Sequence, residues 1–160
     1  MVQERHYNLI FPLFITIFLP PFIIIPLVGN LLIDATIYYL FLRQMNTLPP
    51  FPKLIKMVLP AWVLGFIADI MGAALLIAAS EILPLKLDLI GIWTNPITVL
   101  LVLLVIALVG WLIYRLNLWL LGRYQVNHEV SALVALAMSF ITAPWFFLVP
   151  TTWFKAFMGT

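Results

Sequence analysis

The sequence predicts an all-α integral membrane protein built as a bundle of four transmembrane helices. Of its 160 residues, 65% are hydrophobic and only 9% are charged, whereas a soluble domain is roughly half apolar and about one quarter charged. The apolar residues also collect in runs of about 20, the length at which a helix crosses the roughly 30 Å of hydrocarbon in a bilayer. We therefore expect residues 1–160 to form a single membrane domain.

The spans are expected roughly at 24–42, 58–79, 97–117 and 131–149. The third of these reads VLLVLLVIALV at its centre, and this almost wholly aliphatic composition favours a helix that faces lipid or another subunit. It begins at TNPIT, where Thr94 or Asn95 can act as N-cap and Pro96 takes the first helical position.

An apolar segment at residues 9–23 precedes the first span. Together the two would make a stretch of about 34 residues, or about 51 Å as one helix, which is too long for a straight crossing. Pro12, the Pro20–Pro21 pair and Pro26 remove backbone donors, so the helix should break between Pro20 and Pro26. We expect residues 9–23 to form a re-entrant or interfacial segment, and a fifth crossing is the alternative.

The distribution of basic residues predicts the orientation. The connection 43–57 carries three Lys or Arg residues and the segment 115–130 carries two, whereas the connection 80–96 has only Lys86. The positive-inside rule therefore places the first and third connections in the cytoplasm, with the side of the N-terminus left open. We expect the membrane to be a prokaryotic plasma membrane.

Several classes of function are excluded by residues that the chain lacks. No dense cluster of Lys or Arg predicts a nucleic-acid partner, and the absence of cysteine removes disulfides and thiolate chemistry. The segment HEVSA, residues 128–132, begins like a zinc-protease helix but has Ala132 where a second histidine is needed. Ser139 has no histidine or lysine at membrane depth to activate it. We expect no cofactor, no metal and no catalytic residue.

The feature that points to function is the pair Asp34 and Asp69, each near the centre of an apolar span. A carboxylate at the bilayer centre costs about 2.5 to 3.5 kcal/mol on insertion scales, so the pair would cost roughly 5 to 7 kcal/mol if uncompensated. The first two spans are joined by a short connection and should be antiparallel neighbours. Asp34 and Asp69 are therefore expected to face each other inside the bundle.

Helical spacing predicts which residues accompany the two aspartates. Asn30, Asp34 and Tyr38 recur at intervals of four and form one polar stripe. The second span carries a stripe of small residues around Asp69, which favours close helix contact in lipid. The fourth span contributes a face of small and hydroxylated residues. The predicted polar core is Asn30, Asp34, Asp69, Ser139 and Thr142, with Tyr38 in support.

Two carboxyl groups close together in a low-dielectric core cannot both ionise cheaply, so at least one should hold a proton near neutral pH. Such a site can exchange a proton for a cation or a substrate, and intramembrane acids serve in this way in pumps and transporters. The structural alternative is a protonated aspartate that fastens helices together. Arg115 is the one cation that could reach this core as a counter-ion, although its long side chain can equally snorkel to the interface.

Three functions follow from this pattern. The first is a small proton- or cation-coupled transporter or channel in which Asp34 and Asp69 exchange the ion and Asn30 orients Asp34. The second is a non-catalytic accessory subunit of a larger membrane complex. The third is an intramembrane aspartyl hydrolase. Because four short helices enclose little volume, we also expect a homo-oligomer or a partner membrane subunit, with membrane lipid around it.

The hydrolase alternative comes from two short segments. GNLLID, which ends at Asp34, and IADIMGAALL, which contains Asp69, resemble the catalytic segments of lipoprotein signal peptidases, which are four-span proteins of about this size. The resemblance implies two aspartates that activate water between them. The chain departs from the pattern, because no Arg follows Asp34 and the two acidic spans come first rather than last.

Overall fold

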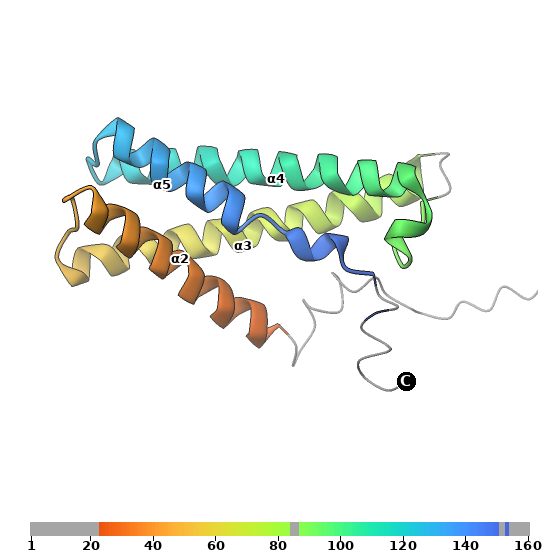
Figure 1. Ribbon diagram of the computed structural model, residues 1–160, viewed down its shortest axis with the longest axis horizontal. Coiled ribbons are helices and arrows are strands. Elements are labelled where there is room, and N and C mark those ends of the chain that lie inside the picture. The colour runs from red at the N-terminus through yellow and green to blue at the C-terminus, as the bar shows by residue number, and fades with distance from the viewer. Residues whose placement is uncertain (1–22, 84–86, 151–152, 154–160) are drawn as a thin grey trace, which may run out of the picture.

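The computed structural model describes residues 23–83, 87–150 and 153, and these are helical throughout apart from the connections (Figure 1). No strand occurs among them, so the all-α prediction is confirmed. The predicted re-entrant segment, all but its last residue, lies outside the described residues. The main helices are α2 (Ile24–Gln44), α3 (Phe51–Ile82), α4 (Pro96–Arg123) and α5 (His128–Ile141), and two short 3-10 helices are η1 (Ile92–Thr94) and η2 (Trp145–Leu148).

Four helical segments of the described chain are long and apolar enough to cross a membrane, as judged by length and composition: α2, α3, α4 and the combined segment His128–Leu148. The four predicted spans therefore correspond to these four segments. With 32 residues, α3 is about 48 Å long, so it exceeds the hydrocarbon thickness. It begins earlier than predicted because Pro52 lies in its first turn, where the fixed φ of proline favours a helix and no backbone donor is needed.

The long helices α3 and α4 run antiparallel side by side, while α2 and α5 cross them obliquely (Figure 1). α4 packs against both α3 and α5, and α2 also packs against α3 and α5. The prediction that the third span faces lipid or another subunit is therefore wrong for one side of α4. Its buried side includes Val102, Val105, Val109 and Ile113. Aliphatic composition did not reveal this, because a lipid-facing side and a helix-facing side can both be aliphatic when helices pack through van der Waals contact.

Two glycines lie at close contacts between helices. A Cβ added at Gly72 of α3 would lie 2.6 Å from Cγ2 of Val109 and 3.0 Å from the Phe147 ring. A Cβ at Gly110 of α4 would lie 3.1 Å from the carbonyl oxygen of Ser139. By contrast, Gly65 of the predicted small-residue stripe has nothing within 4 Å. Of these two glycines of α3, only the one that follows Asp69 by one turn lies in a close contact.

The start of α4 is as predicted. The Asn95 side chain caps the helix by accepting a hydrogen bond from the backbone N–H of Ile97 at 2.9 Å, and Pro96 follows as the first helical residue. At the start of α5, Asn127 accepts from the N–H of Glu129 at 2.9 Å in the same way. These side chains supply acceptors for N–H groups that no helical carbonyl can reach.

Both α2 and α4 end at the same side of the bundle (Figure 1). Both endings also have the same backbone motif. After α2, Asn46 has a φ of 53°, and the N–H of Thr47 donates to the Leu42 carbonyl at 2.9 Å. After α4, Gln125 has a φ of 59°, and the N–H of Val126 donates to the Leu121 carbonyl at 3.2 Å. This is the Schellman ending, in which one left-handed residue reverses the chain and satisfies the last carbonyls.

The fourth span was predicted as one segment over 131–149, but the structure interrupts its helix. α5 ends at Ile141, and the helix resumes only as η2 at Trp145. The cause is Pro144, which has no N–H and disfavours helix at the residue before it. The Trp145 indole N–H compensates by donating to the Phe140 carbonyl oxygen at 2.7 Å.

A second proline lies inside a helix. Pro60 of α3 cannot donate to the carbonyl of Lys56, four residues earlier. The Tyr124 hydroxyl, which follows α4, donates to that carbonyl oxygen at 2.6 Å. A neighbouring segment thus satisfies the acceptor that proline leaves, as is usual for prolines in membrane helices.

Candidate functional site

The two intramembrane aspartates are buried on neighbouring helices. Asp34 lies on α2 and Asp69 on α3, and each side chain is only 3% exposed. Both therefore face the inside of the bundle, as helical spacing predicted. The charge of Asp34 acts on Asp69, so the two carboxyl groups lie within electrostatic range of each other. The packing of α2 against α3 places the two aspartates on neighbouring helices, which the short connection makes antiparallel.

Neither carboxyl group is fully satisfied. Within the described part of the chain, Oδ1 of Asp34 and Oδ1 of Asp69 are buried and have no hydrogen-bond partner. A buried polar atom without a partner costs roughly 1 to 3 kcal/mol, and more if the group is charged. Most native cores avoid this cost, so two such atoms in one small bundle need an explanation.

Tyr38 and Asn117 form a buried polar pair near the aspartates. The Tyr38 side chain is 0% exposed, and its hydroxyl donates to Oδ1 of Asn117 on α4 at 2.7 Å. Nδ2 of Asn117 in turn donates to the Ile113 carbonyl oxygen at 2.9 Å. Tyr38 lies one turn after Asp34 on α2 and within electrostatic range of its carboxyl group. Tyr38 was predicted as a supporting residue, and Asn117 was missed.

The signal that could have found Asn117 is weak. It is a single amide close to the end of an apolar run, a position equally typical of the membrane interface. Only the rotation of α4 about its axis decides that Asn117 faces inward.

Asn30 lies one turn before Asp34 on α2 and is half-buried. No hydrogen bond between the two side chains occurs among the described residues, so the orienting role expected for Asn30 stays a prediction.

Ser139 and Thr142 are also half-buried. Their hydroxyls donate to the carbonyls of Leu136 at 2.8 Å and Met138 at 2.7 Å, both on their own helix.

Arg115 lies on the exposed side of α4. Its guanidinium carbon is 5.9 Å from the centroid of the Trp111 ring, one turn earlier on the same helix. This cation–π contact, and the exposed position, correspond to the snorkelling interpretation and not to a counter-ion beside either aspartate.

The described residues contain no group of three or more His, Cys, Asp or Glu side chains that could hold a metal ion. The chemistry open to the site is therefore that of two carboxyl groups, a tyrosine hydroxyl and an amide. Such groups can accept, hold and release a proton, or give a cation a few oxygen ligands.

The connection between α3 and α4 holds a third aspartate in a different setting. Asp88 accepts hydrogen bonds from the N–H groups of Gly91 at 2.8 Å and Ile90 at 3.1 Å. Its Oδ2 also lies 2.8 Å from the Thr94 hydroxyl. The Gly91, Thr94 and Ile90 donors hold the pKa of Asp88 below its usual range, against a smaller opposing effect of burial. Asp88 therefore stabilises the α3–α4 connection through these hydrogen bonds.

Comparison with protein families, curated proteins and solved structures finds no match to this chain. The short resemblance to lipoprotein signal peptidases gains no support from these comparisons. The arrangement of residues is therefore the basis for any functional conclusion.

Proposed function

We propose that the protein is a small transporter or channel of a prokaryotic plasma membrane, coupled to protons or to a cation through Asp34 and Asp69. The observation that carries the proposal is the pair of buried carboxyl groups within electrostatic range of each other. They lie on different helices, so their occupancy can affect how α2 and α3 pack. Intramembrane acids in such positions are typical of ion and proton pathways.

The unpartnered oxygens favour transport over simple fastening of the helices. An aspartate that only joins two helices would find donors that satisfy both oxygens, as Asp88 does in its connection. Oδ1 of Asp34 and Oδ1 of Asp69 have no such donor among the described residues. A site that binds and releases an ion must keep acceptors available for it.

Among possible ions, the proton fits this site best. A divalent cation takes about six or more oxygen ligands, and the two carboxyl groups supply at most four. The Tyr38 hydroxyl and the Asn117 amide already bond to each other and to the Ile113 carbonyl. A proton needs one acceptor only, so we place it first and a monovalent cation second.

Flux measurements in proteoliposomes test the proposal. Wild-type protein is compared with Asp34→Asn and Asp69→Asn under proton and sodium gradients, with pH- and Na⁺-sensitive dyes. Both variants should lose most of the flux, because an amide cannot exchange a proton. Asp88→Asn is the matched control: it makes the same chemical change outside the spans and should keep the flux.

The absence of wild-type flux under either gradient, or its persistence in both aspartate variants, would contradict the proposal. In the first case the accessory-subunit function becomes the better explanation. Helix content by circular dichroism and elution as a single peak in detergent confirm that each variant is folded.

We also propose that the path runs along an interface between copies of the chain, because a bundle of only four helices encloses little volume. Native mass spectrometry from a mild detergent should then show a homo-oligomer. A single protomer as the only species would count against a shared path.

A further inference from the structure

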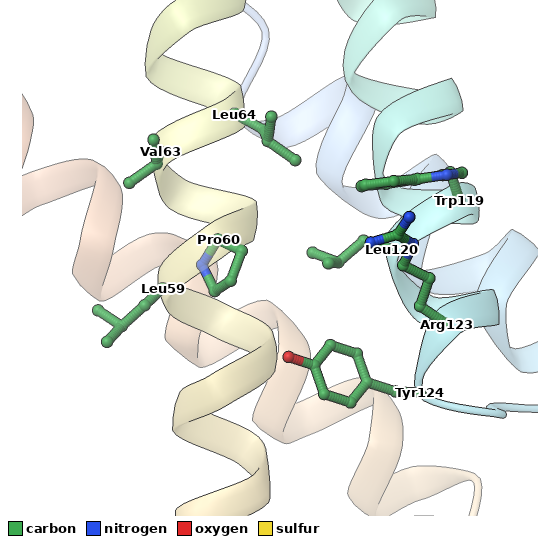
Figure 2. Close-up of a pocket in the computed structure, with 8 residues that line it drawn as sticks. All are labelled: Leu59, Pro60, Val63, Leu64, Trp119, Leu120, Arg123 and Tyr124. Atoms are coloured by element: carbon green, nitrogen blue, oxygen red, sulfur yellow. The ribbon is translucent and has the colours of Figure 1, made fainter.

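A groove lies between α3 and α4 near the end of the bundle where the α4–α5 connection begins (Figure 2). It has a volume of about 760 Å³. One wall comes from α3 around Pro60, and the other comes from the last turns of α4 and from Tyr124 (Figure 2). A groove of this volume between helices that are apolar enough to span a membrane lies open to acyl chains.

The lining of the groove is apolar apart from its end. Pro60 and Leu64 on α3 face Leu120 across the space (Figure 2). Arg123 is the one charged residue among the eight that line the groove. The Tyr124 hydroxyl already donates its hydrogen bond to the Lys56 carbonyl oxygen at 2.6 Å, so it is not free to donate to a ligand in the groove.

The Arg123 side chain is held in a defined place. Its guanidinium carbon lies 4.2 Å from the centroid of the Trp119 ring, and Figure 2 shows the two side chains next to each other on the α4 side of the groove. Stacking uses the flat face of a guanidinium and leaves N–H donors at its edge, which match the oxygens of a phosphate. Lys56, one turn before Pro60 on α3, does not line the groove, so Arg123 supplies the positive charge of the groove.

We propose that this groove is a binding site for an anionic phospholipid, with an acyl chain along Pro60, Leu64 and Leu120 and the phosphate at Arg123. Charge complementarity selects this occupant. An apolar helix from a second copy would cover Arg123 without pairing its charge, whereas a lipid phosphate pairs it and the acyl chain fills the apolar part. The site does not include Asp34 or Asp69, so it is independent of the proposed transport.

Quenching of Trp119 fluorescence by brominated lipid tests the site. The full chain is reconstituted in phosphatidylcholine vesicles that contain a minor fraction of phosphatidylglycerol with dibrominated acyl chains, or the same fraction of dibrominated phosphatidylcholine. The difference between wild type and Trp119→Phe isolates the Trp119 signal. Brominated phosphatidylglycerol should quench it more strongly than brominated phosphatidylcholine at equal content.

Arg123→Gln should reduce the preference for phosphatidylglycerol about fivefold, the effect of one basic side chain near an anionic surface. Arg123→Lys keeps the charge and should retain most of it. Arg115→Gln is the matched control, because Arg115 also lies over a tryptophan one turn earlier on α4 but does not line the groove.

Two results would overturn the proposal. Equal quenching by the two brominated lipids would show that the groove does not select anionic lipid. Absence of Trp119 quenching by either lipid would show that protein, either a second copy or another chain, covers the groove.

Discussion

The hydrogen bond between Tyr38 and Asn117 links α2 to α4 in the interior of the bundle. Tyr38→Phe removes the hydroxyl and leaves the Asn117 oxygen buried without this donor. We expect the free energy of unfolding in detergent to fall by about 1 kcal/mol. In an Asn117→Leu background the same substitution should no longer destabilise the protein and should even stabilise it slightly, since the buried Tyr38 hydroxyl has already lost its acceptor.

Tyr39→Phe is the control for this cycle. Tyr39 is the next residue of α2 and is exposed, and its hydroxyl accepts from Arg43 at 3.0 Å. Such an exposed contact should contribute little. An equal loss of stability in Tyr38→Phe and Tyr39→Phe would show that the buried hydrogen bond is not a significant contributor.

Asp88 predicts a pH dependence that does not involve the buried pair. Its pKa is lowered in the folded protein by the donors of Gly91, Thr94 and Ile90. It therefore stabilises the fold at pH values above the usual aspartate value of about 4, and this contribution is lost as the pH falls through that value towards the lower folded pKa. We expect the thermal midpoint of wild type to fall more steeply below about pH 4 than that of Asp88→Asn.

Glu81→Gln should follow the wild-type curve, because Glu81 is an exposed carboxyl group at the end of α3. Parallel curves for wild type and Asp88→Asn would contradict a stabilising role for the Asp88 carboxylate.

The two buried aspartates could be predicted from sequence because a charge in the middle of an apolar run has few structural explanations. Asn117 could not be predicted, since whether it faces inward depends on the rotation of α4. Ser139 and Thr142 were grouped with the aspartates from spacing alone. The structure shows that their hydroxyls bond to carbonyls of their own helix, a local interaction that competes with any role across the bundle.

The link between Tyr124 and α3 shows how a helix with an internal proline is stabilised by a neighbouring segment. Tyr124→Phe should lower the free energy of unfolding by about 1 kcal/mol, because the Lys56 carbonyl then loses its donor. In Pro60→Ala, alanine restores the N–H that reaches this carbonyl, so Tyr124→Phe should have little further effect. Unfolding of the four proteins in one detergent measures the coupling. An equal effect of Tyr124→Phe in both backgrounds would disprove the compensation.

Helix boundaries were predictable where local chemistry acts alone. Asn95 and Pro96 fix the start of α4, and the observed start agrees with the prediction. The prolines elsewhere were harder to interpret, because proline both begins and interrupts helices. Pro52 lies in the first turn of α3, Pro60 is accommodated inside it, and Pro144 separates α5 from η2. Which of these outcomes occurs depends on neighbours that can replace the lost hydrogen bond.

At the scale of the whole bundle, the ends differ in charge. The α2–α3 and α4–α5 connections lie at the same end (Figure 1), and the basic residues of the predicted cytoplasmic side belong to these connections and the adjoining turns.

The chain has no cysteine, so a single introduced thiol can be labelled without background. Met45→Cys and His128→Cys should react with an impermeant maleimide only from the cytoplasmic side, and Glu81→Cys only from the other side.

All three positions are exposed in the structure, so labelling reports the side of the membrane and not burial. Labelling of Met45→Cys and His128→Cys from opposite sides would contradict the arrangement of the four helices. Labelling of all three from the reverse sides would keep the fold and invert the orientation.

The contact at Gly72 also has a consequence for the order in which the chain is made. Gly72 faces Val109 of α4 and Phe147 of η2. These two residues follow Gly72 in the chain by 37 and 75 positions and are therefore synthesised later. Until those residues emerge from the ribosome and insert, only α2 among the described helices is available to pack against α3, and Gly72 lacks its partners. The packing around Gly72, one turn beyond Asp69, is therefore completed only when η2 has entered the membrane, and α3 must insert while this part of its surface is still uncovered.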